Sequence, residues 1–166
     1  NQFDGTQEQF FLPGGAGYHT AWDSMCFDYG KPAVMHFLLS NLKYWLEEFH
    51  LDGFRFDGIT SMLFNDHGLG TNFDSYAKYF SMNTNIDAVS YLTLATSLVH
   101  ELKPEAVLIA EDMSGMPGLC LPPEECGIGF DYRLALGIPD LWIKLMQTDD
   151  HDWSMHKIYF ELTTRR

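Results

Sequence analysis

The chain has 166 residues, of which 46% are hydrophobic and 15% aromatic, and it carries a formal net charge of −13 at pH 7. This apolar content supports a packed core and is unlike that of a disordered segment, so we expect residues 1–166 to belong to one domain. The acidity disfavours binding to nucleic acid or to an anionic membrane. Three cysteines are too few for a disulfide framework, which favours a reducing, cytoplasmic compartment.

Residues 1–31 are rich in glycine, aspartate and aromatic residues and show neither helical nor strand periodicity. This pattern predicts a long surface loop, and loops of this length often serve in binding. The chain begins with Asn1 and stops at Arg166 within what reads as a continuing element. We therefore expect a piece of a longer protein.

A regular pattern begins at Pro32, where apolar residues start to recur three and four positions apart. The spacing predicts an amphipathic helix over residues 32–50, with proline in its first turn. A short link then leads into a predicted strand over residues 53–57. Residues 60–80 are too irregular to form one element.

The second half of the chain alternates helices and short strands. Helical spacing predicts a helix over 87–102, and the apolar run 106–110 predicts a strand buried on both faces of a parallel sheet. A third strand is expected over 128–133, followed by helices over 134–146 and 153–162. This alternation predicts an α/β fold, either a parallel sheet or a barrel, with helical crossovers.

The strand over 53–57 carries two charges. Because side chains alternate between faces, Arg55 and Asp57 share one face and Phe54 and Phe56 share the other. A charged pair on a short apolar strand is a poor choice for a buried position, which points to function. Arg55 is expected to keep Asp57 ionised.

A second acid, Glu111, follows the apolar run 106–110. Catalytic groups in parallel α/β folds gather at the C-terminal ends of strands, so Glu111 and Asp57 are expected to share one site. Two carboxylates across a small gap suit glycoside chemistry, with retention at a separation of about 5 Å and inversion at a wider one. We expect burial to keep Glu111 neutral as the proton donor.

The spacing of these charged residues in the sequence is also compatible with two other roles. Arg55 and Asp57 form a buried structural ion pair in one of them, while Glu111 and Asp112 cap a helix. In another, Asp57, Glu111 and Asp112 bind magnesium in a barrel lyase or isomerase. We expect no metal site at Cys120 and Cys126, because this pair lacks a second Cys or His pair at zinc spacing.

Three residues of the N-terminal loop are candidates for substrate binding: His19, Trp22 and Asp23. Aromatic faces stack on pyranose rings, so these residues can line a sugar subsite. The alternative is a loop aromatic that packs onto the body of the domain.

Several longer stretches resemble a known family. The stretches DGFRFDGITSMLFNDHGLG, IAEDMSGMP and GFDYRLALGIPDLW, with FDGT, AWDS and FDYGK upstream, resemble the 1,4-α-glucan branching enzymes of the α-amylase superfamily. The likeness runs through nearly the whole chain in the same order. It implies a partial (β/α)8 TIM barrel, formed by roughly the middle strands and helices of a larger catalytic domain that is truncated at both ends.

The resemblance also implies roles for individual residues. Asp57 would be the nucleophile, Glu111 the proton donor and Arg55 the arginine beside the nucleophile, with no cofactor or metal. The AWDS stretch would lie near the site. Such enzymes cleave an α-1,4-glucan through a covalent glycosyl-enzyme intermediate and transfer the chain to a 6-hydroxyl, which forms an α-1,6 branch in glycogen.

The same resemblance places a third catalytic aspartate beyond Arg166, and His151 and Asp152 are not expected to replace it. We therefore expect the segment to be inactive alone. An α-glucan hydrolase of the same superfamily, of amylase or debranching type, and a non-catalytic glucan-binding barrel are the alternatives.

Overall fold

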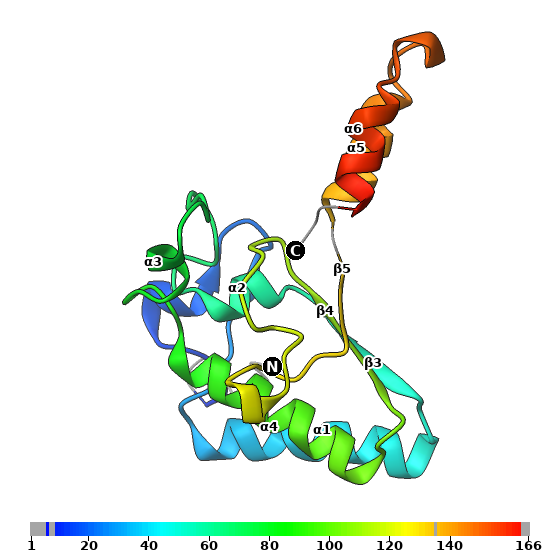
Figure 1. Ribbon diagram of the computed structural model, residues 1–166. Helices are drawn as coiled ribbons and strands as arrows, with labels where there is room; N and C mark the ends of the chain where they lie inside the picture. The colour runs from blue at the N-terminus through cyan, green and yellow to red at the C-terminus, as the bar shows by residue number, and fades with distance from the viewer. Residues whose placement is uncertain (1–5, 7–8, 135, 164–166) are drawn as a thin grey trace.

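The chain folds around a three-stranded parallel sheet in which the strands lie in the order β3, β4, β5 (Figure 1). The computed structural model describes residues 6, 9–134 and 136–163. The strands of this sheet are β3 (Gly53–Phe56), β4 (Val107–Glu111) and β5 (Tyr132–Leu134). Their parallel pairing confirms the predicted α/β class. The third strand begins later than predicted, because a loop takes up the residues before it.

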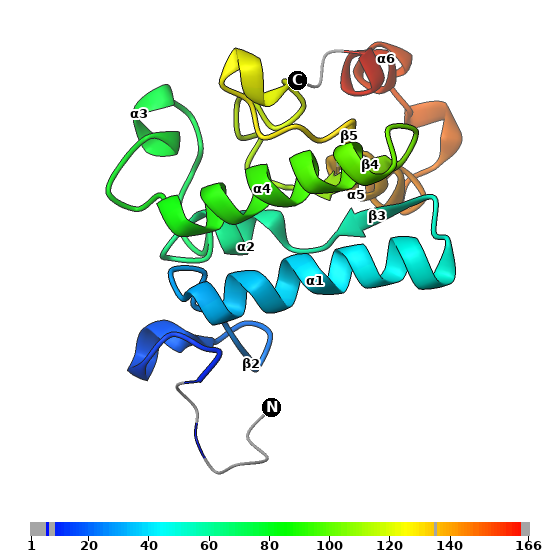
Figure 2. The same cartoon turned by 90° about the horizontal axis from the view of Figure 1, so that it is seen from below.

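Two long helices, α1 (Pro32–Phe49) and α4 (Ile86–Leu102), lie side by side along one face of the sheet (Figures 1 and 2). Both were predicted from apolar spacing. Pro32 occupies the first turn of α1, and the Asn85 side chain caps α4 by accepting a hydrogen bond from the Ala88 N–H. Apolar side chains of both helices pack with the sheet in one core, which includes Leu42, Leu46, Leu92, Ala95, Val99, Leu108 and Ala110.

The opposite face of the sheet is left open by the described residues. Strand register places Arg55 beside Ile109, and Ile109 beside Tyr132, on this face. The side chain of Arg55 is 53% exposed and Tyr132 is 63% exposed. Parallel sheets are normally covered on both faces, and within the described residues this one is covered by helices on one face only.

The N-terminal segment differs from the predicted loop. It contains a 3-10 turn, η1 (Gly14–Gly17), and a small antiparallel hairpin of β1 (Tyr18–His19) and β2 (Ser24–Met25). Strands of two residues are too short to show an alternating pattern, so periodicity could not reveal them. The irregular segment after β3 contains two short helices, α2 (Ile59–Leu63) and α3 (Tyr76–Tyr79).

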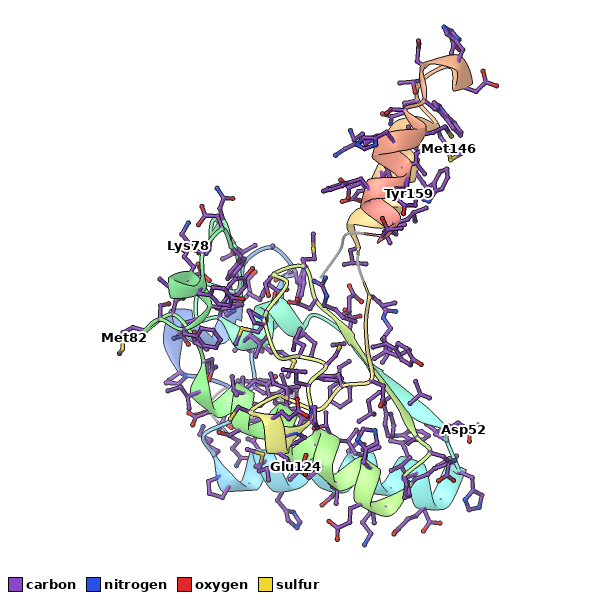
Figure 3. The ribbon with its side chains drawn as sticks, viewed as in Figure 1. Asp52, Lys78, Met82, Glu124, Met146 and Tyr159 are labelled. Carbon is purple, nitrogen blue, oxygen red and sulfur yellow. The ribbon has the colours of Figure 1, made fainter. Side chains whose placement is uncertain are left out.

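The last helices, α5 (Gly137–Leu145) and α6 (Met155–Thr163), pack against each other and project away from the sheet (Figure 1). Two further 3-10 turns are η2 (Pro123–Glu125) and η3 (Asp150–Asp152). Both predicted helices are present, although α5 starts later because β5 extends through Leu134. Met146 and Tyr159 at this projecting pair are 77% and 68% exposed (Figure 3).

None of the helices in the described part of the chain combines the length and hydrophobicity that a membrane crossing requires.

Candidate active site

The two predicted acids lie at the same edge of the sheet. Asp57 follows the last residue of β3, and Glu111 is the last residue of β4. The parallel register pairs Phe56 with Ala110, so the next residue of each strand lies at the same level. Neighbouring strands are about 4.8 Å apart, so this register predicts that the two carboxylates lie close together.

Arg55 contacts the second acid more strongly than the first. Its guanidinium donates a hydrogen bond to Glu111 Oε2 and forms an ion pair with it. The pKa of Arg55 is raised by this hydrogen bond and by the charge of Glu111, while Asp57 adds a weaker attraction. The ion pair of Arg55 is thus with Glu111, and the expectation that Arg55 keeps Asp57 ionised stays a prediction.

One alternative interpretation, which involves burial, is also corrected. A buried Arg55–Asp57 ion pair is wrong, because both residues are exposed. The side chain of Glu111 is only 16% exposed, as its strand position predicts, and Arg55 bonds to it. The expectation that Glu111 is the neutral proton donor stays a prediction.

Each acid lines a cavity. Asp57 lines one of about 500 Å³, and Glu111 lines a second of about 370 Å³. The two cavities are neighbours, because both are lined by His19, Trp22, Gly58, Ser61 and His67. The N-terminal hairpin thus supplies side chains to the space beside both acids.

His19 is the buried member of an aromatic stack. Its ring lies 4.1 Å from that of Trp22 and 4.7 Å from that of His67, centroid to centroid. The Ser61 hydroxyl donates to the His67 carbonyl oxygen, so His19 Nε2, 3.0 Å away, donates to Ser61 Oγ. His19 Nδ1 is then an acceptor with no hydrogen-bond partner among the described residues. Burial, and then the charge of His67, lowers the pKa of His19.

The other two predicted substrate-binding residues differ from each other in placement. Trp22 is 56% exposed and lines both cavities, so the outer part of its ring is open to a ligand. Asp23 lies in the turn of the hairpin, where it accepts a hydrogen bond from the Tyr18 hydroxyl at 2.6 Å. It is not among the described residues that line the two cavities.

Comparisons with known proteins show what the sequence of this chain is similar to. No protein-family model matches the sequence. Curated relatives include proteins named 1,4-alpha-glucan-branching enzyme from Rhizophagus irregularis and Equus caballus, each 52% identical over 168 residues. One named 1,4-alpha-glucan-branching enzyme 2-2, chloroplastic/amyloplastic, from Arabidopsis thaliana is 49% identical over 167 residues. All three alignments cover 100% of this chain.

The chain is homologous to part of the 1,4-alpha-glucan-branching enzymes. It spans 21% to 25% of the length of these three relatives. The predicted family resemblance is thereby confirmed, and the homologous proteins are enzymes. The name of the Arabidopsis branching enzyme refers to plastids, so a cytoplasmic location for this chain stays a prediction.

Several residues that line the cavities were not predicted as site residues. Ser61 and His67 line both cavities, and Thr60 lines the cavity of Glu111. The signal that was available is proximity in sequence: Thr60 and Ser61 lie within one helical turn of the predicted nucleophile. Their orientation depends on α2, which the irregular sequence of this segment did not reveal.

The magnesium interpretation conflicts with the hydrogen bonds of Asp112. Both of its carboxylate oxygens accept hydrogen bonds from protein donors, so they do not offer free lone pairs to a cation. A cluster in the described chain that brings ligand atoms within 4.8 Å of one another consists of Asp149, His151 and Asp152, all exposed. It belongs to η3, remote in sequence from both acids.

Proposed function

We propose that this chain, as part of a longer polypeptide, cleaves an α-1,4-glucan and transfers the released chain to a 6-hydroxyl, which forms an α-1,6 branch in glycogen. One observation carries the proposal: Asp57 and Glu111 sit level on adjacent parallel strands in a segment about half identical to branching enzymes. Because the chain spans only part of those relatives, its substrate and activity are assigned by homology together with this geometry.

We further propose that residues 1–166 are the middle part of a single (β/α)8 barrel domain. The open face of the sheet supports this arrangement. In a barrel, helices cover the outer face of each strand, and the inner face is filled by side chains from the other strands. Exposed residues such as Tyr132 and Arg55 would then lie inside the barrel, near its C-terminal end.

In the proposed mechanism, Glu111 donates a proton to the leaving glycosidic oxygen while Asp57 attacks the anomeric carbon. The bond from that carbon to oxygen breaks, and an ester to Asp57 forms. The 6-hydroxyl of a second chain then attacks the same carbon and gives its proton to Glu111. The ester to Asp57 breaks, and the configuration of the anomeric carbon is retained. Arg55 bonds to Oε2 of Glu111, so the proton is donated from Oε1 while this contact holds the carboxyl group in place.

The experiment requires the longer chain that carries this segment, called the parent chain below. It is incubated with amylose while iodine colour and reducing ends are followed. Branching lowers the colour without a matching rise in reducing ends, whereas an α-glucan hydrolase changes both in parallel. Loss of colour in step with reducing ends would replace the transferase proposal by the hydrolase one.

Two substitutions test the roles of the acids. Glu111→Gln should lower kcat about 10²- to 10⁴-fold, the usual contribution of general acid–base catalysis. Asp57→Asn should abolish turnover, because an amide cannot form the ester intermediate. Full activity of the Asp57→Asn parent chain would refute the nucleophile role and favour a glucan-binding function.

The isolated 166-residue chain should not turn over amylose. Its sheet has unpaired edges and one open face, so the site lacks the surroundings that a closed barrel would supply. Measurable branching by the isolated chain would contradict the proposal that the site is completed by other parts of the parent chain.

A further inference from the structure

Asp112, the residue after Glu111, is a fully buried carboxylate that the proposed chemistry does not use. It is 1% exposed. Its Oδ1 accepts hydrogen bonds from the Ser114 N–H at 3.1 Å and the Ser114 hydroxyl at 2.7 Å. Its Oδ2 accepts from the Gly115 N–H at 2.7 Å and the Met116 N–H at 3.3 Å. One side chain therefore holds the whole turn that leaves β4.

The same carboxylate is tied to the segment that follows Asp57. The Thr60 hydroxyl donates to Asp112 Oδ1 at 2.7 Å. Thr60 Oγ1 in turn accepts hydrogen bonds from the Met113 N–H at 2.9 Å and the Ser114 N–H at 3.2 Å. A single hydroxyl group thus links the first turn of α2 to the backbone directly after Glu111.

The hydrogen bond between Thr60 and Asp112 joins the segments that follow the two proposed catalytic acids. Asp57 and Glu111 are 54 positions apart in the sequence. Thr60 lies three residues after Asp57, and Asp112 directly follows Glu111. A buried carboxylate is costly unless donors surround it, and this one is surrounded by donors on both oxygens. Arg133 Nη1 lies 3.6 Å from Oδ2 and adds a positive charge.

We propose that Thr60 and Asp112 are a positioning pair that holds Glu111 at a set distance and angle from Asp57, so that proton donation and nucleophilic attack occur together. The inference rests on the proposed function, because it assigns what the pair positions. Glu111 is then oriented from two sides: Arg55 bonds to its carboxylate, and Asp112 fixes the backbone that follows it.

The test compares two substrates in the parent chain. Amylose needs a proton donor for its leaving oxygen, whereas the fluoride of α-maltosyl fluoride leaves with little help from an acid. A misplaced Glu111 should therefore slow amylose far more than the fluoride. Thr60→Val and Asp112→Asn should lower kcat on amylose about 10- to 100-fold, the range expected for a displacement near 1 Å, with KM changed less than about twofold.

Two further variants make the result specific. Thr60→Ser keeps the hydroxyl and should restore most of the amylose activity. Thr96→Val is the control, because it makes the same change at a threonine away from both acids. The Thr96 side chain is fully buried, whereas Thr60 is partly buried, and its hydroxyl donates to the backbone carbonyl oxygens of Thr93 and Ile128. Thr96→Val should lower the unfolding temperature to a similar extent and leave the ratio of the two activities unchanged.

The outcomes separate this inference from the proposed function. Equal slowing of both substrates by Thr60→Val and Asp112→Asn, or a profile like that of Thr96→Val, would overturn the positioning pair. Glu111→Gln serves as the reference for a lost proton donor. If Glu111→Gln itself slows both substrates equally, the proton-donor role fails, and with it the proposed function.

Discussion

Gly58, between the proposed nucleophile and α2, makes a testable link between backbone conformation and the substrate cavity. It has a φ of +64°, in the left-handed region that favours glycine. A Cβ atom at this position would lie 2.8 Å from Trp22 Cη2 and 2.9 Å from Cζ3. Gly58→Ala therefore combines backbone strain with a collision against the aromatic ring that lines both cavities.

The two contributions can be estimated separately. Alanine in the left-handed region costs about 1–2 kcal/mol. The Trp22 ring must retreat by about 0.6 Å to reach the 3.4 Å at which ordinary van der Waals contact begins, and overpacking of this kind costs about 1–3 kcal/mol. Since Trp22 is stacked on His19, its retreat disturbs that contact too. We expect Gly58→Ala to lower the free energy of unfolding by about 2–5 kcal/mol.

Gly14 provides a matched control. Its φ is +62°, and no atom lies within 4 Å of the Cβ that alanine would add. Gly14→Ala should carry the backbone term of about 1–2 kcal/mol alone. The difference between the two variants isolates the contact with Trp22.

The assay is a double-mutant cycle on the parent chain, with thermal unfolding and amylose branching as readouts. Trp22→Ala removes the ring, so Gly58→Ala should cost no more in that background than Gly14→Ala does. In the unaltered background, Gly58→Ala should also raise KM for amylose. Equal stabilities of Gly58→Ala and Gly14→Ala would refute the reasoning, because Trp22 would then not be packed on Gly58.

Two other predictions concern pH and helix capping. Burial lowers the pKa of His19 from 6.5, so the unfolded chain binds its proton more tightly. The free energy of unfolding should therefore decline as the pH falls below about 6.5 and level off below the folded-state pKa of His19. Thermal unfolding of the parent chain across this pH range measures the decline. An equal decline in the His19→Gln variant would contradict the prediction. Asn85→Ala removes the cap of α4, whose side chain accepts from the Ala88 N–H at 3.1 Å, and should cost about 1 kcal/mol in denaturant unfolding. The exposed Asn41→Ala on α1 is the control and should change stability by less than about 0.5 kcal/mol; equal losses would argue against the cap.

The elements that periodicity predicted are those that are long or apolar. The spacing in α1 and α4 and the apolar run of β4 indicated each element within a few residues of its bounds. The hairpin of β1 and β2 was missed, because its strands are too short to carry a pattern. The position of this hairpin near the site was predicted only through the candidate substrate-binding residues His19, Trp22 and Asp23.

By itself, the sequence determined the α/β class, the family resemblance and the placement of Asp57 and Glu111 at strand ends, because these depend on local order along the chain. Only the tertiary structure decided the partners. Arg55 bonds to Glu111 across 56 positions, and Thr60 bonds to Asp112 across 52. Such contacts depend on strand register and on how α2 packs beside β4, and side-chain alternation within one strand carries no information about either.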